Sequence, residues 1–66
     1  ASEVAVTNRA GRSIDGFILY DVTGKLVERR ETRGNTIYIT LPESQGIYFV
    51  QLQVGEEQEL IRVLKY

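Results

Sequence analysis

Residues 48–54 read Tyr48-Phe49-Val50-Gln51-Leu52-Gln53-Val54, and this stretch decides the class of fold. Every second side chain from Tyr48 to Val54 is apolar, and two of the positions between them are glutamines. Side chains of a β-strand point alternately to its two faces, whereas the apolar positions of a helix recur about every 3.6 residues. The pattern therefore predicts a strand that buries one face and turns its glutamines to solvent.

The rest of the chain divides into short segments of the same kind. Alternating, β-branched or aromatic residues predict five more strands, over residues 3–7, 13–21, 25–31, 36–41 and 59–66. Turn-forming residues are frequent in the segments between them, which are 8–12, 21–24, 32–35, 42–46 and 55–58. Short strands at intervals of about 8–12 residues, with no helical period, are typical of a sandwich or barrel. We expect residues 1–66 to form one small, all-β, antiparallel β-sandwich.

Two strands carry expectations about their place in a sheet. The consecutive apolar run Phe17–Tyr20 predicts a central strand with both faces covered. Gly16 beside it marks a bulge or the close approach of another backbone. The charged run Glu28–Glu31 is typical of an edge strand that resists pairing with another molecule.

The period of two also assigns side chains to faces in two other strands. One face of segment 36–41 carries Ile37, Ile39 and Leu41, which we expect in the core. In the last strand we expect Ile61 and Val63 to face the core. Arg62 and Lys65 are expected on the solvent side.

The clearest turn in the chain is Asp21-Val22-Thr23-Gly24. An Asp at the first position of a turn accepts a hydrogen bond from the backbone two residues later, and Gly at the fourth position adopts a positive φ at little cost. Asp21 and Gly24 are therefore expected to form the turn of a β-hairpin.

The composition excludes several classes of function. The chain has 8 Lys and Arg against 9 Asp and Glu, a net charge of −1, so we expect no nucleic-acid partner. Its longest apolar runs have four residues, and a helix needs about 20 to span a bilayer, so no transmembrane segment is expected. Cysteine and histidine are both absent, which argues against a transition-metal site, and no motif indicates a cofactor.

Catalysis has no support in the residues. The serines at positions 2, 13 and 44 have no histidine to act as a base. The carboxylates of Asp15 and Asp21 fall on a strand and its turn, with no sign of a pocket. Residues Glu56, Glu57 and Glu59 lack the Asp/Asn alternation and the glycine of a calcium loop. We predict that the protein is not an enzyme and binds no metal.

Three motifs, in order, carry a resemblance to a known family. They are the hairpin sequence of residues 17–27, the segment Ile37–Pro42 followed by Gly46-Ile47-Tyr48, and the basic end Arg62-Val63-Leu64-Lys65. In this order they resemble the type A C-terminal sorting domain of the Bacteroidetes type IX secretion system. The chain departs from the family at both ends, since it lacks the usual Pro-Asn-Pro segment before the first strand and ends in Tyr66.

The resemblance implies a seven-stranded, immunoglobulin-like β-sandwich that closes a larger secreted protein, with the cargo domains and the signal peptide upstream. Such a domain directs its cargo from the periplasm through a translocon in the outer membrane to the cell surface. A sortase-like cysteine peptidase then commonly removes it and links the cargo to lipopolysaccharide. By the resemblance, Gly46 and Tyr48 match the Gly-x-Tyr motif, Asp21 and Gly24 the hairpin turn, and Arg62 and Lys65 the basic tail.

The residues leave alternatives open. Tyr48 is expected to pack in the core with its hydroxyl hydrogen-bonded at the surface, or else to be recognised by the translocon. Arg62 and Lys65 are ordinary residues of an edge strand or a basic signal for the secretion machinery. Unpaired strand edges leave open a homodimer. The alternative function is that of a structural, adhesin or carbohydrate-associated accessory domain of a surface protein.

Overall fold

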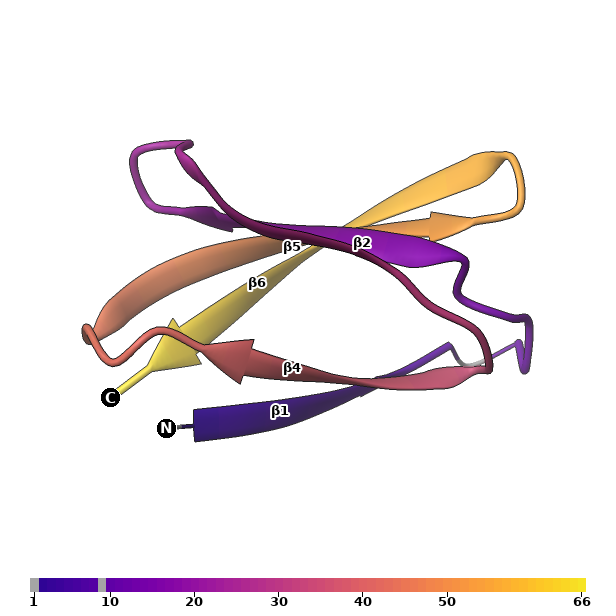
Figure 1. Cartoon of the computed structure of the whole chain (residues 1–66), viewed down its shortest axis with the longest axis horizontal. Coiled ribbons are helices and arrows are strands. Elements are labelled where there is room, and N and C mark those ends of the chain that lie inside the picture. Colours follow the sequence, from indigo (N-terminus) through magenta and orange to yellow (C-terminus); the bar gives the residue numbers. More distant parts are fainter. Residues whose placement is uncertain (1, 9) are drawn as a thin grey trace.

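The computed structural model describes residues 2–8 and 10–66, all of which lie in strands, turns or loops, with no helix among them (Figure 1). The six strands are β1 (Ser2–Thr7), β2 (Gly16–Asp21), β3 (Leu26–Glu31), β4 (Thr36–Leu41), β5 (Gly46–Val54) and β6 (Glu57–Lys65). Strands β1 and β4 pair in a two-stranded sheet, and the other four form a sheet in the order β3-β2-β5-β6. Every pairing is antiparallel, which confirms the prediction of an all-β antiparallel domain with six strands.

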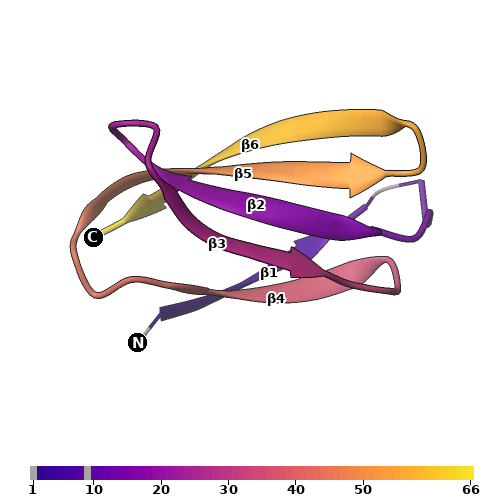
Figure 2. The same ribbon diagram turned by 45° about the horizontal axis from the view of Figure 1, so that its top comes forward.

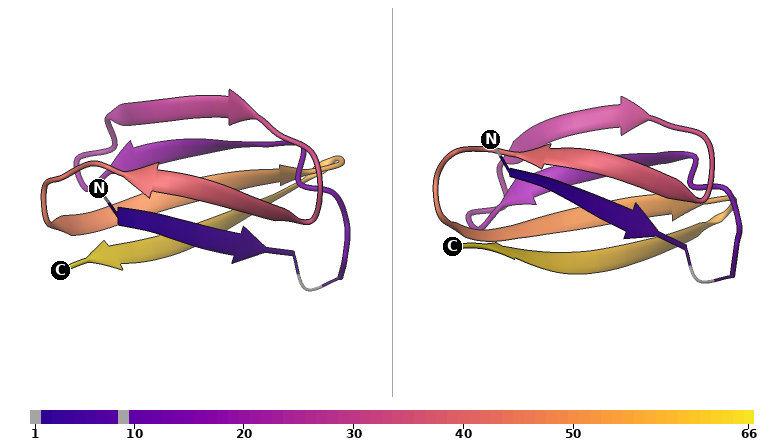
Figure 3. Two further views of the ribbon diagram at one scale, coloured as in Figure 1. Left: turned by 60° about the horizontal axis from the view of Figure 1, so that its bottom comes forward. Right: turned by 90° about the horizontal axis from the view of Figure 1, so that it is seen from below.

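The two sheets lie face to face, with the two-stranded sheet across the middle of the larger one (Figures 2 and 3). Strands β3 and β6 form the two edges of the larger sheet. Between the sheets lies one core of buried side chains: Ile14, Phe17, Leu19, Ile37, Ile39, Leu41, Tyr48, Val50, Leu52 and Val54. Val4, Val6, Ile61 and Val63 are partly buried against it.

The period of two places these side chains as the sequence predicts. In β4 the odd-numbered residues Ile37, Ile39 and Leu41 are buried, and in β5 the even-numbered residues from Tyr48 to Val54 are buried. Ile61 and Val63 of β6 lie opposite Val50 and Tyr48 and face the same core. Burial of a complete aliphatic side chain contributes about 1.5–3 kcal/mol, so these alternating positions supply most of the stability of the domain.

Strand β2 is central, but the prediction that both its faces are covered is wrong. Its inward side chains Phe17 and Leu19 are buried, whereas Ile18 and Tyr20 lie half-buried on the outer face of the four-stranded sheet. No second layer packs on that face among the described residues. Gly16 is confirmed as a point of close approach, because a Cβ there would lie 2.9 Å from the carbonyl oxygen of Arg30.

Three strands begin two or more residues away from the predicted first residue. Strand β2 begins at Gly16 and not at residue 13, although the loop before it is anchored by hydrogen bonds from the amides of Ile14 and Asp15 to the carbonyls of Gly34 and Gln53, at 2.8 and 2.7 Å. Strand β5 begins already at Gly46. Strand β6 begins at residue 57, because a turn of only two residues joins it to β5. The first of these, Gly55, has φ 62°, as a type II′ turn requires.

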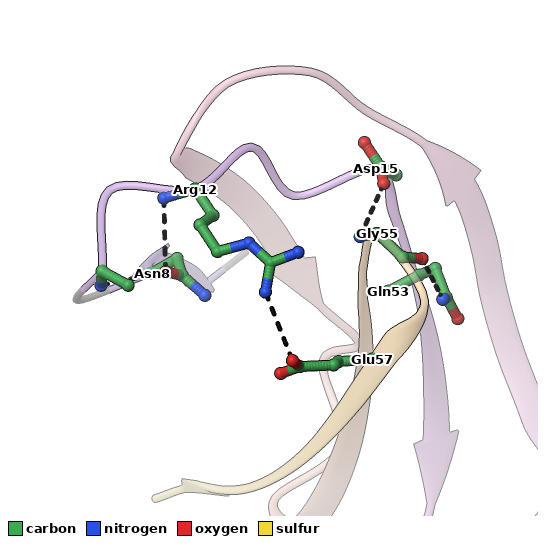
Figure 4. A network of polar contacts seen from close by, with 7 residues as sticks. Asn8, Arg12, Asp15, Gln53, Gly55 and Glu57 are labelled. Atoms are coloured by element: carbon green, nitrogen blue, oxygen red, sulfur yellow. Dashed lines mark hydrogen bonds and ion pairs between the residues drawn. The ribbon is translucent and has the colours of Figure 1, made fainter.

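Polar contacts hold the loops together at the end of the molecule that carries this turn (Figure 4). The buried Asn8 accepts hydrogen bonds through Oδ1 from the amides of Ala10 and Arg12, at 3.0 and 3.4 Å. The Asp15 carboxylate accepts one from the Gly55 amide at 2.9 Å. These contacts hold the β1–β2 loop against the β5–β6 turn. The candidate site lies at the opposite end of the molecule.

Candidate functional site

Two connections that are far apart in sequence lie at the end of the molecule opposite the β5–β6 turn (Figure 1). They are the β2–β3 turn and the β4–β5 loop, residues 42–45. Between them lies a groove of about 460 Å³ whose apolar lining includes Val22, Leu26, Val27, Pro42, Ile47 and Tyr48. Asp21 and Gly46 also line this groove. The structure thus brings together three residues that the sequence singled out from two separate motifs, namely Asp21, Gly46 and Tyr48.

The β2–β3 turn is held by one carboxylate. Oδ1 of Asp21 accepts hydrogen bonds from the Thr23 amide at 2.9 Å, the Thr23 hydroxyl at 2.6 Å and the Lys25 amide at 3.0 Å. These bonds favour the charged form, so the Thr23 hydroxyl first, and then the Lys25 amide, lower the pKa of Asp21 below its ordinary value of 3.8. Gly24 has φ 86° and donates its amide to the Asp21 carbonyl at 3.0 Å. The predicted turn is confirmed in both residues.

Tyr48 packs in the core and also holds the loop beside it. Its side chain is only 4% exposed. Its hydroxyl donates a hydrogen bond to the carbonyl of Ser44 at 2.7 Å. This is the core position with a surface hydrogen bond that the sequence predicted as one of two alternatives. Because the ring and the hydroxyl both have partners within the chain, Tyr48 sets the position of the β4–β5 loop.

Lys65 lies on a different face from the one predicted. It is in register with Gly46 and shares the inward face of β6 with Ile61 and Val63. Its ammonium donates a hydrogen bond to the carbonyl of Pro42 in the β4–β5 loop. The prediction assigned Lys65 to solvent by its charge, whereas strand period puts it on the same side as residues 61 and 63. Lys65 therefore joins the end of β6 to the loop that borders the groove.

Arg62 is separate from the groove. It is exposed and lies opposite Phe49 on the outer face of the four-stranded sheet. Phe49 in turn pairs with Tyr20, and Tyr20 with Leu26 of β3. Arg62 thus ends a row of side chains that crosses all four strands. The two basic residues of the tail therefore point to different surfaces, and only Lys65 contacts the site.

The groove is lined by apolar side chains together with Asp21 and Lys25. Most of its lining is apolar, and its turn contributes a carboxylate whose hydrogen bonds are made within the chain. Asp15 and Asp21 lie at opposite ends of β2, about 20 Å apart for strand geometry, so they cannot act as a pair. Ser13 and Ser44 likewise lie in loops at opposite ends of the molecule. Among the described residues, no group of three or more acidic side chains is placed to hold a metal ion.

Comparison with known proteins adds no relative. The chain matches no protein-family model, no curated protein and no solved structure. Within residues 2–8 and 10–66, no helix is long and apolar enough to cross a membrane.

Sequence reasoning missed several residues that shape the molecule. Ile14 is fully buried, although it lies in the loop before β2 and not in the strand predicted over residues 13–21. Asn8 is the one buried polar side chain of the described residues, and its turn-forming character was the only signal for it. The groove itself could not be found from periodicity, because its two walls come from segments 21–27 and 42–48.

Proposed function

We propose that this chain is a C-terminal sorting and anchoring domain of a secreted bacterial surface protein. It acts without catalysis, as an immunoglobulin-like β-sandwich of the type A sorting family of the type IX secretion system. Its partners are the outer-membrane translocon and a sortase-like peptidase, and its cargo lies upstream in the same polypeptide. Its place of action is the cell surface, reached through the periplasm and the outer membrane.

One observation carries the proposal. The family-like motifs are far apart in sequence, yet Asp21, Gly46 and Tyr48 border one groove, and Lys65 is bonded to the loop beside it. Val22 and Leu26 line this groove and are 63% and 51% exposed. Core packing does not require this exposure. Exposed apolar side chains that gather in a groove are typical of a surface that binds another protein.

The experiment is export of a reporter fused to the N-terminus of this chain, in a Bacteroidetes host with an intact type IX system. Leu26→Glu places a charge in the groove, and we expect the folded fusion to remain in the periplasm. The matched control is Tyr38→Glu, because Tyr38 is 58% exposed but lies on the outer face of the two-stranded sheet. We expect the control to be exported as the parent is. Equal export of both folded variants would exclude the groove as the recognition surface.

The alternative, a carbohydrate-associated domain, has less support. Sugar-binding faces use exposed aromatic rings in a row. Here Tyr48 is buried, Tyr38 lies on the other sheet, and the paired Tyr20 and Phe49 are only half-exposed. A depression of about 280 Å³ on the outer face contains Gln51, Gln53 and Gln58. Their amides already bond to one another and to the Gly55 carbonyl, so they are not preorganised for sugar hydroxyls.

A further inference from the structure

The two edges of the four-stranded sheet differ in how they are protected. Strand β3 has six residues, a register shift opposite Leu19 and Tyr20, and the charged side chains Glu28 and Arg30 on its inward face. Bulges and inward charges are devices that keep an edge from pairing with another chain. Strand β6 has nine residues in unbroken register with β5. Among the described residues no strand pairs with its other side.

The side chains of β6 are unusual for an unpaired edge. Leu60 and Leu64 are 68% and 47% exposed, on the outer face. On the inward face, Ile61 and Val63 are only partly covered by the core. Figure 3 shows β6 at the margin of the molecule, beyond the two-stranded sheet. Since every second residue of an antiparallel edge also leaves its N–H and C=O unpaired, β6 presents both apolar surface and main-chain hydrogen-bonding groups.

The charges of β6 are divided between its two halves. The acidic residues Glu57 and Glu59 lie in the first half, and the basic residues Arg62 and Lys65 lie in the second. A second β6 strand that runs antiparallel would bring opposite charges together, whereas a parallel one would bring like charges together. Two β6 strands therefore have complementary charges only when they run antiparallel.

We propose that β6 binds the β6 strand of a second copy of this chain, antiparallel, about a two-fold axis at Ile61. In this register Glu57 lies opposite Lys65 of the second copy at both ends, and Ile61 lies opposite itself. All nine residues of the strand are then paired, and the two four-stranded sheets become one continuous sheet. The proposal concerns assembly and does not depend on the proposed function.

The neighbouring registers are less favourable. A two-fold axis at Arg62 would place that cation opposite itself, and like charges directly opposite are destabilising. An axis at Leu60 would leave Lys65 without an acidic partner. In the register at Ile61, Lys65 can keep its bond to the Pro42 carbonyl, because an ammonium has three donors. Glu57 contacts Arg12 only at 3.5 Å through exposed side chains, so it is available to a new partner.

Disulfide trapping tests the register, and the chain has no cysteine of its own. In the proposed dimer, Ile61→Cys places two sulfurs across a pair of Cα atoms about 4.5–5.5 Å apart, within the range for a disulfide. We expect this variant to form a covalent dimer in a glutathione redox buffer. Val63→Cys is the matched control, because it has the same face and similar burial but lies opposite Glu59. The proposal is overturned if Val63→Cys or Arg62→Cys forms the dimer and Ile61→Cys does not.

A charge exchange tests the pairing without a covalent bond. Glu57→Lys and Lys65→Glu should each weaken self-association in analytical ultracentrifugation by about 10-fold, because each creates two like-charge contacts in the dimer. A mixture of the two variants should form a heterodimer again, since every end pair then joins opposite charges. A parent protein that stays monomeric at millimolar concentration, or variants that do not recover on mixing, would exclude the β6 dimer. Export of a reporter is measured separately, so either proposal can fail alone.

Discussion

Arg30 and Phe17 are cross-strand partners, and the guanidinium carbon of Arg30 lies 5.1 Å from the centre of the Phe17 ring. The same guanidinium donates to Glu28 Oε2 through Nη2 at 2.6 Å and through Nε at 3.0 Å. Phe17 is only 2% exposed, although it lies beside the edge strand β3. The charged pair therefore covers the core at this edge, where Arg30 also donates through Nη1 to the Tyr38 carbonyl of β4 at 3.5 Å.

Replacing Arg30 should uncover Phe17. We expect Arg30→Ala to lower the free energy of unfolding by about 1–2 kcal/mol in urea denaturation, because the cation–π contact and the packing of the aliphatic stem are both lost. Arg29→Ala is the control, since Arg29 is an exposed residue of the same strand on the outer face. The control should change stability by less than about 0.5 kcal/mol. Equal losses in the two variants would show that Arg30 does not cover the core.

The lowered pKa of Asp21 predicts a pH dependence of stability. The unfolded chain binds the proton of Asp21 more tightly than the folded one, so stability rises with pH between the folded pKa and the ordinary value near 4. The contribution is complete above that window and is lost as pH falls through the folded pKa. Thr23→Val removes the largest cause, and we expect the NMR titration of Asp21 to move up toward 3.8.

The control for this titration is Thr40→Val, an exposed threonine of β4 with no contact to the turn. It should leave the Asp21 titration unchanged. If Thr23→Val also leaves it unchanged, the Thr23 hydroxyl does not set the pKa of Asp21.

The period of two predicted which faces are buried in β4 and β5 because each side chain is assigned by position alone. The prediction for Lys65 was wrong because its charge was used there in place of its position in the strand. Lys65, which was predicted on the solvent side, and Arg30 both face inward by period. Long basic side chains can do this because their stems cover apolar surface while the charged end finds an oxygen or a ring.

Strand partners could not be predicted from the pattern. An alternating strand can pair with any neighbour that shares its buried face, so nothing in residues 2–7 shows that β1 joins β4 and not β6. The groove depends on these partners, because its two walls lie on different connections. Only the local features of the site, such as the Asp21 turn, follow from a short stretch of sequence.

Asn8 should be the polar residue of the β1–β2 loop most sensitive to substitution. Its Oδ1 accepts from two amides, and Asn8→Ala would leave the amides of Ala10 and Arg12 without that partner. We expect a loss of about 1–3 kcal/mol, because two hydrogen bonds that each contribute about 0.5–1.5 kcal/mol net are removed. Asn35→Ala is a suitable control, because Asn35 is exposed and the substitution keeps the main-chain carbonyl that accepts a hydrogen bond from the Asn8 amide. Similar urea midpoints for the two variants would contradict this role.

Two substitutions of Tyr48 separate its contribution to core packing from the proposed recognition by the secretion machinery. Tyr48→Phe keeps the ring and removes only the bond to the Ser44 carbonyl, so we expect a loss of about 1 kcal/mol and unchanged export of a fused reporter. Tyr48→Ala leaves a cavity in the core and should cost about 3–5 kcal/mol, enough to unfold much of so small a domain. Export should therefore follow the folded fraction, measured by urea denaturation of each variant. A Tyr48→Phe protein that is folded but retained in the periplasm would instead assign the hydroxyl a direct contact with the translocon.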